Sequence, residues 1–279
     1  MYTNGIYNEI QTALHRGERV VVATVVKTVG AAPCGVGSKM LIHANGSNDG
    51  SFGGAPTDAK VTQAALQVLH EGRSYMTHIH LDADNNEAVG SCGATLEVFF
   101  EVVLPEPRLI IAGAGYVAQR LAWLAENLDF RITVIDDRRD LANPQLFDKQ
   151  VQLSFGDIPQ SIREMEPDES SWIVIVTRGH HLDKDALRAA LETNAAYIGM
   201  IGSPSKVRHI FKDLQKEGIA RERLERVHAP IGLDLGAETP DEIALSIAAE
   251  MVMLRKKGSG LPLKTVHSLL DEEVTARHE

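Results

Sequence analysis

The feature that most constrains this 279-residue chain is a pair of glycines between an apolar strand and a helix. The segment from Leu109 to Ala118 is LIIAGAGYVA, in which Gly113 and Gly115 follow four apolar residues. Asp136 ends the next apolar run, 23 residues after Gly113. A strand, a Gly-x-Gly-x-x-Ala turn, a helix and a second strand that ends in an acid are typical of a Rossmann-type α/β domain.

The positions of this motif have separate physical roles in making the turn, packing the helix and binding a phosphate. Gly113 allows the tight turn, and Gly115 lets the backbone approach a phosphate closely. Ala118 is small enough for the helix to pack on the strand. Tyr116 begins the helix, whose unpaired N–H groups attract an anion. The turn therefore predicts a phosphorylated ligand, and the alternative is a frame that keeps its glycines only for packing.

Two charged residues after the second strand extend this candidate site. Asp136 could accept a hydrogen bond from a ribose hydroxyl, and Arg138 could meet an additional phosphate. NAD(P) is therefore one candidate ligand. The same turn accepts any phosphate-bearing group, so the motif alone does not choose among nucleotides and other phosphorylated cofactors.

The rest of the chain predicts a two-domain α/β protein. Pro105 and Pro107 mark a boundary between a smaller α+β domain at 1–104 and a Rossmann-like domain with a parallel sheet at 105–257. Residues 258–279 form a tail, with one short amphipathic helix expected. In the first domain we expect helices at 4–16 and 57–70 and strands at 20–29, 39–43, 75–81 and 94–104. In the second we expect strands at 108–112, 131–135, 151–155, 172–176 and 196–200, and helices at 116–128, 184–192, 203–217 and 240–255.

Two further loops of the second domain follow apolar strands, where open α/β sheets bind their ligands. Gly202 and Ser203 could present backbone donors to a phosphate. The alternative is structural, with Ser203 as a helix cap and Pro204 at the first helical position. An acid–base role is open to the two histidines. The candidate residues in these loops are Thr177, Arg178, His180 and His181 in the first, and Gly202, Ser203 and Lys206 in the second.

Composition excludes several functional classes. A net charge of -10 argues against nucleic acid as a partner. The longest apolar runs, such as Val20–Val26, are too short to span a bilayer, and no secretory signal is visible, so we expect a cytoplasmic protein without membrane contact. The two cysteines, Cys34 and Cys92, form no C-x-x-C pair and predict no structural zinc or disulfide framework. A homodimer is compatible with this composition.

The first domain resembles a known family in three glycine-containing stretches, at 30–40, 50–54 and 90–93. Over residues 5–257 the chain resembles the XdhC/CoxI family, the accessory factors of xanthine dehydrogenase and related molybdenum hydroxylases. In the second domain the resemblance rests on the segments 113–115, 134–138, 177–180, 201–206 and 230–234. Cys34 stands where this family usually has arginine.

The resemblance implies an XdhC/CoxI-type first domain and a protein that binds molybdenum cofactor, shields it and helps deliver it to a hydroxylase apoenzyme. It adds Gly53, Gly54, Cys92 and Gly93 to the cofactor-binding residues. Cys92 matches the family's Cys-Gly position, which makes it the candidate thiolate ligand of the metal. The alternative for Cys92 is a small buried hydrophobic residue.

Three functions remain open from the sequence. One is an accessory factor without turnover of its own, another is an NAD(P)-dependent oxidoreductase of unknown substrate, and the third is a folded scaffold that acts only through its partner. Dehydrogenases place an acid or base opposite the nicotinamide, and outside the glycine turn only His180, His181 and Lys206 offer one. This shortage of catalytic groups favours the non-enzymatic accessory factor.

Overall fold

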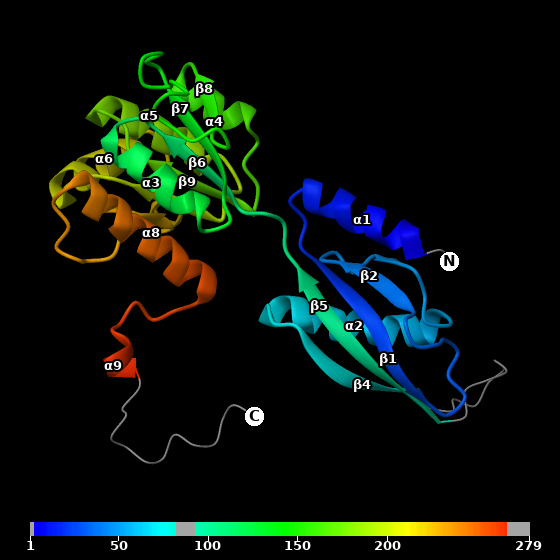
Figure 1. Cartoon of the computed structure of the whole chain (residues 1–279). Coiled ribbons are helices and arrows are strands. Elements are labelled where there is room, and N and C mark those ends of the chain that lie inside the picture. The colour runs from blue at the N-terminus through cyan, green and yellow to red at the C-terminus, as the bar shows by residue number, and fades with distance from the viewer. Residues whose placement is uncertain (1–2, 82–92, 267–279) are drawn as a thin grey trace. The chain divides into compact units, whose positions relative to one another are not determined.

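The computed structural model describes residues 3–81 and 93–266. The chain divides into two compact units, Met1–Glu106 and Pro107–Glu279, and each unit has its own sheet (Figure 1). In the described residues no helix combines the length and the apolarity needed to cross a bilayer.

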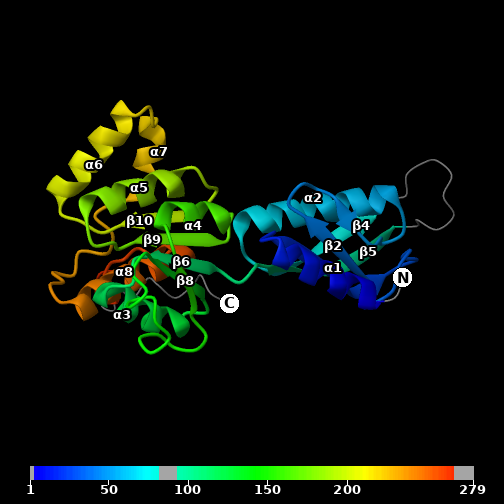
Figure 2. The ribbon, with the colours of Figure 1, turned by 90° about the horizontal axis from the view of Figure 1, so that it is seen from above.

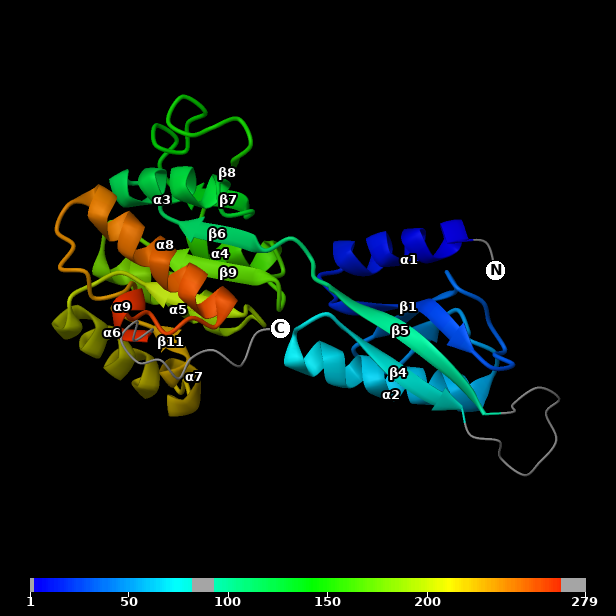
Figure 3. The same ribbon diagram turned by 60° about the horizontal axis from the view of Figure 1, so that its bottom comes forward.

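The first unit is an antiparallel sheet between two helices. Its strand order is β3-β2-β1-β5-β4. Helices α1 and α2 lie on opposite faces of this sheet (Figure 3). Because both faces are covered, β1 is apolar on both sides: Val21 and Val25 pack toward α2, and Val20 and Val22 pack toward α1. The elements are α1 (Thr3–His15), β1 (Val20–Val29), β2 (Lys39–His43), β3 (Asn48–Asp49), α2 (Ala55–Glu71), β4 (Tyr75–Leu81) and β5 (Ala94–Val103).

The second unit is a parallel sheet of six strands in the order β11-β10-β9-β6-β7-β8. Numbered from β6, this is the order 3-2-1-4-5-6 of doubly wound dinucleotide-binding sheets, which reverses direction between β6 and β9. Ligands of such sheets bind at the carboxyl ends of the strands at this switch point. The strands are β6 (Arg108–Ala112), β7 (Arg131–Asp136), β8 (Gln152–Phe155), β9 (Ser171–Ile175), β10 (Tyr197–Met200) and β11 (Val227–His228).

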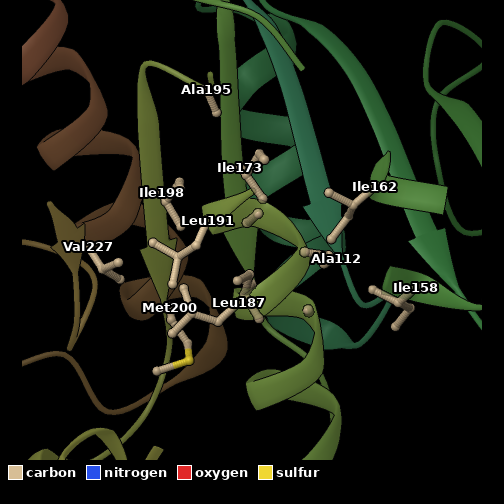
Figure 4. Packing of buried hydrophobic residues seen from close by; sticks show 14 of the residues in the cluster. Ala112, Ile158, Ile162, Ile173, Leu187, Leu191, Ala195, Ile198, Met200 and Val227 are labelled. Atoms are coloured by element: carbon tan, nitrogen blue, oxygen red, sulfur yellow. The ribbon is translucent and has the colours of Figure 1, made fainter. Parts of the chain in front are cut away.

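Helices cover both faces of the parallel sheet (Figure 2). Along β6, Leu109 and Ile111 face the α3 and α8 side, whereas Ile110 faces the α4, α5 and α6 side. Figure 4 shows the hydrophobic core on the α4, α5 and α6 side, where Leu187 and Leu191 of α5 pack on the sheet. The helices are α3 (Tyr116–Glu126), α4 (Ile158–Glu164), α5 (His180–Leu191), α6 (Pro204–Lys216), α7 (Arg221–Glu225), α8 (Pro240–Lys256) and α9 (Leu263–Val266).

One expected boundary differs from the structure by more than two residues, and several short elements were not expected. Helix α5 begins at His180 rather than at residue 184, because Gly179 is its N-cap and the residues after it form the first helical turn. The elements β3, α4, α7 and β11 span two to seven residues. Segments this short carry too few residues for a period to be recognised.

Candidate cofactor site

Gly113 lies at the switch point and is required by the fold itself. Its φ is 109°, a region that side chains rarely adopt. A Cβ atom at this position would lie 2.5 Å from the carbonyl oxygen of Val176, just beyond β9. The glycine therefore lets β6 and β9 come together closely at their carboxyl ends.

Gly115 differs from Gly113, because no residue that the structure describes requires it to be glycine. It is the N-cap of α3 with a φ of -70°, and a Cβ atom there would have no described neighbour within 4 Å. Among the described side chains, none caps the start of α3. Ala118 is fully buried under the helix, whereas Tyr116 is 79% exposed beside the turn. The α3 N-terminus thus offers backbone N–H groups to open space, where an anion can approach.

Asp136 is engaged beneath the glycine turn. Its side chain is buried, and its two oxygens accept hydrogen bonds from the Ala114 N–H at 2.7 Å and the Arg138 N–H at 2.9 Å. The Arg138 guanidinium donates to both oxygens, at 2.9 and 3.0 Å. Burial raises the pKa of Asp136, but the hydrogen bonds from Arg138 and the backbone outweigh it and lower the pKa overall. These two predicted site residues therefore bind each other.

The loop after β9 contributes a second ion pair to this edge of the sheet. The Arg178 guanidinium donates two hydrogen bonds to Asp137, from Nη1 to Oδ1 at 2.5 Å and from Nη2 to Oδ2 at 2.8 Å. This hydrogen bonding and the negative charge of Asp137 raise the pKa of Arg178. His180 and His181 occupy the first turn of α5, with ring centroids 5.9 Å apart.

Asp183, three residues after His180, is a buried acid that is not among the predicted site residues. It has no solvent exposure, accepts a hydrogen bond from the Thr177 hydroxyl at 2.6 Å and contacts the Lys206 ammonium. It therefore joins the loop after β9 to the first turn of α6. The place of Asp183 in the first turn of α5 could have indicated that it is buried, but the sequence predicted a loop at 180–183.

The loop after β10 shapes the position of Lys206. Ser203 caps α6, because its hydroxyl accepts the Lys206 N–H at 3.2 Å. A Cβ atom at Gly202 would lie 3.0 Å from Cδ of Lys206, so the glycine leaves room for the lysine stem. The capping role of Ser203 is thus present in the structure, and the same loop places a lysine at the carboxyl edge.

In the first unit, Gly53 and Gly54 lie at the start of α2. A Cβ atom at Gly53 would lie 2.3 Å from Cβ of Pro33, so the loop after β1 packs directly on this glycine. The Ser51 hydroxyl accepts the N–H groups of Gly53 and Gly54 at 3.1 and 3.2 Å, and it donates to Asp58 at 2.7 Å. These residues form a closed network at one end of the sheet.

Of the two cysteines, the structure describes Cys34 and not Cys92. Cys34 lies in the loop after β1, and its burial together with the charge of Asp58 raises the pKa of its thiol. A raised pKa keeps the thiol protonated and unreactive near neutral pH. Cys92, the candidate metal ligand, lies outside the described residues, and Gly93 directly precedes β5. In the described part of the chain, no three His, Cys, Asp or Glu side chains are grouped to hold a metal ion.

The fold and the turn together define a Rossmann-type protein with an additional α+β domain. The chain belongs to the XdhC family. Residues 109–251 match the model of the XdhC Rossmann domain, and residues 13–80 match that of the XdhC and CoxI family.

Three relatives show how widely this similarity extends. The chain is 35% identical over 252 residues to the uncharacterized protein YqeB of Escherichia coli K12, which covers 88% of this chain and 46% of YqeB. It is 27% identical to a probable xanthine dehydrogenase subunit from Bacillus subtilis 168, covering 90% of this chain and 65% of that protein. It is 22% identical to the molybdenum cofactor insertion chaperone PaoD of Escherichia coli K12, covering 87% and 86%. The chain thus spans about half the length of YqeB and about two thirds of the length of the Bacillus subtilis protein.

Proposed function

We propose that this protein is an accessory factor that binds molybdenum cofactor and assists its insertion into a xanthine dehydrogenase-type molybdenum hydroxylase. Membership of the XdhC family supports this role, as does the similarity to an insertion chaperone. On this proposal the cofactor is cargo, and the protein has no turnover of its own. Its partners are the cofactor and the hydroxylase apoenzyme.

The observation that carries the proposal is the uncapped, open N-terminus of α3 at Gly115. A pterin cofactor that ends in a phosphate needs backbone donors with nothing in their way, and the space beside Gly115 meets that need. The first turn of α6 adds Lys206 at the same carboxyl edge of the sheet. The phosphate end of the cargo is therefore assigned to the second unit.

The molybdenum end of the cofactor requires few ligands from the protein. The dithiolene of the cofactor itself holds molybdenum, so a cluster of protein ligands is not needed. One soft thiolate suffices to complete or shield the metal, and Cys92 is the proposed residue. Gly53, Gly54 and Gly93 are proposed as further cofactor-binding residues, on the family resemblance of their two stretches.

An NAD(P)-dependent oxidoreductase is the alternative, and the strand order of the sheet favours it as much as it favours any nucleotide site. Asp136 argues against it. In dinucleotide sites this acid accepts hydrogen bonds from the ribose, whereas here it is buried and holds Ala114 and Arg138. This engagement leaves Asp136 no free oxygen for a ribose hydroxyl and therefore supports molybdenum cofactor over NAD.

The test is transfer of the cargo under anaerobic conditions. The purified protein is incubated with molybdenum cofactor, separated by gel filtration, analysed for molybdenum and pterin, and mixed with an apo-hydroxylase. We expect near-stoichiometric retention and activation of the hydroxylase. Gly115→Asp should abolish both, because it places charge and bulk where the phosphate approaches. Gly5→Asp is the matched control, since a Cβ atom at Gly5 also meets no described atom within 4 Å.

Two results would contradict the proposal. One is equal retention of cofactor by folded Gly115→Asp and by the wild type. The other is stoichiometric NAD(P) binding with measurable hydride transfer and no retention of molybdenum cofactor.

A further inference from the structure

Three cations at the carboxyl edge of the parallel sheet are each paired with an acid. The pairs are Arg138 with Asp136, Lys206 with Asp183, and Arg178 with Asp137. In the first two pairs the acid is buried, with 1% of Asp136 and none of Asp183 exposed. Moving either acid would leave a charge without its partner inside the protein, at a large cost.

The third pair lies at the surface. The side chains of Arg178 and Asp137 are 45% and 31% exposed. Exposed ion pairs contribute little to stability, because water solvates both partners when they separate. Of the three pairs, Arg178–Asp137 is therefore the one that can open without disturbing the fold.

This pair lies beside the glycine turn. Asp137 follows β7 and Arg178 follows β9, and these two strands flank β6, which leads into the turn. Nη1 of Arg178 is also 4.0 Å from Oδ1 of Asp136, whose other oxygen accepts the Ala114 N–H. The guanidinium is thus held at the switch point, next to the site proposed for the phosphate.

The form of the pair matches phosphate recognition. Both nitrogens of the Arg178 fork donate to the two oxygens of Asp137, at 2.5 and 2.8 Å. A guanidinium fork binds two oxygens of a phosphate in the same way. Asp137 therefore occupies the positions that two phosphate oxygens would take.

We propose that Asp137 is a specificity-determining residue that competes with the ligand for Arg178. A phosphate displaces Asp137 and takes over both hydrogen bonds, and the freed carboxylate turns to solvent. A doubly charged phosphate outcompetes the single charge of Asp137, whereas a neutral or weakly charged ligand does not. This selection rests on the proposed function, because it assumes a phosphorylated ligand at the glycine turn.

The test is calorimetric titration of the full chain with inorganic pyrophosphate. We expect Asp137→Asn to bind the probe about threefold to fivefold more tightly than the wild type, the scale of an exposed ion pair. Asp140→Asn is the matched control. It removes the same charge from the same loop, and Asp140 and Asp137 both act electrostatically on Arg138, but Arg178 donates to Asp137.

A double-mutant cycle isolates the competition from a general charge effect. In an Arg178→Ala background the gain from Asp137→Asn should disappear, because the cation for which the two anions compete is absent. Tighter binding that depends on Arg178 supports the proposal. Weaker binding by Asp137→Asn, a gain equal to that of Asp140→Asn, a gain that persists without Arg178, or no pyrophosphate binding by any variant would overturn it.

The two proposals fail in different ways. If the wild type retains molybdenum cofactor but Asp137→Asn shows no gain for pyrophosphate, the competition is wrong and the accessory function stands. If Asp137→Asn gains affinity for pyrophosphate while no variant retains molybdenum cofactor, the competition stands and the identity of the cargo is wrong.

Discussion

At the scale of single residues, the two glycines of the turn serve different purposes. Gly113 is fixed by the approach of the chain just beyond β9 and by its positive φ. Gly115 has an ordinary φ and open space around it. The sequence motif treats both glycines as one signal, whereas in the structure the described residues require a glycine at position 113 and not at position 115.

This difference gives opposite expectations for the two alanine variants. Gly113→Ala should lower the free energy of unfolding by about 3 kcal/mol or more, since backbone strain and overlap each cost about 1–3 kcal/mol. Gly115→Ala should cost less than about 1 kcal/mol, the scale of a weaker N-cap. Urea unfolding of both variants measures this, and equal losses would contradict the separation of their roles.

Asp136 should make the second unit sensitive to acid. Its pKa is lowered by folding, so the stability that it contributes is complete above the ordinary carboxyl pKa of 3.8 and is lost as the pH falls through the lower, folded value. Asp136→Asn should therefore be less stable than the wild type at neutral pH, with a difference that shrinks below about pH 4. Denaturant unfolding from pH 7 to pH 3 measures this. Parallel stability curves would refute it.

At the scale of elements, the sequence predicted long periodic segments well and missed loops that depend on distant partners. The β6–turn–α3 unit follows from glycine spacing and apolar runs alone. The start of α5 was misplaced, because its first turn contains two histidines and an acid that resemble a loop. Asp183 becomes recognisable only when α6 brings Lys206 to it. Likewise, Arg178 and Asp137 are 41 residues apart, and only the strand order brings them together.

Helix α8 begins with a capping box, a motif that four consecutive residues of the sequence, Thr239 to Glu242, contain in full. The Thr239 hydroxyl accepts the Glu242 N–H, and the Glu242 carboxylate accepts the Thr239 N–H at 2.9 Å. Thr239→Ala should destabilise the protein by about 1 kcal/mol. Ser205→Ala, in the first turn of α6 rather than at its cap, should cost less. Thermal and urea unfolding compare the two variants, and a larger loss for Ser205→Ala would contradict the assignment.

At the scale of the whole molecule, the buried apolar residues of the two units form separate clusters. Those of the first unit lie between Ile6 and Val103, and those of the second unit lie from Leu109 onward. Units with their own cores can fold independently. We therefore expect residues 107–279, expressed alone, to unfold cooperatively and to keep the pyrophosphate affinity of the full chain. A fragment with no cooperative transition would show that the second unit depends on the first.

The most direct measurement of the central claim is anaerobic thermal unfolding of the full chain with molybdenum cofactor and, separately, with NAD and NADP. At 100 times its dissociation constant, a ligand should stabilise the wild type by about 2.7 kcal/mol. For a chain of this size that corresponds to a rise of several degrees in the midpoint. We predict this rise with molybdenum cofactor for the wild type and for Gly5→Asp, and its loss in Gly115→Asp. A rise with NAD or NADP and none with molybdenum cofactor would contradict the account.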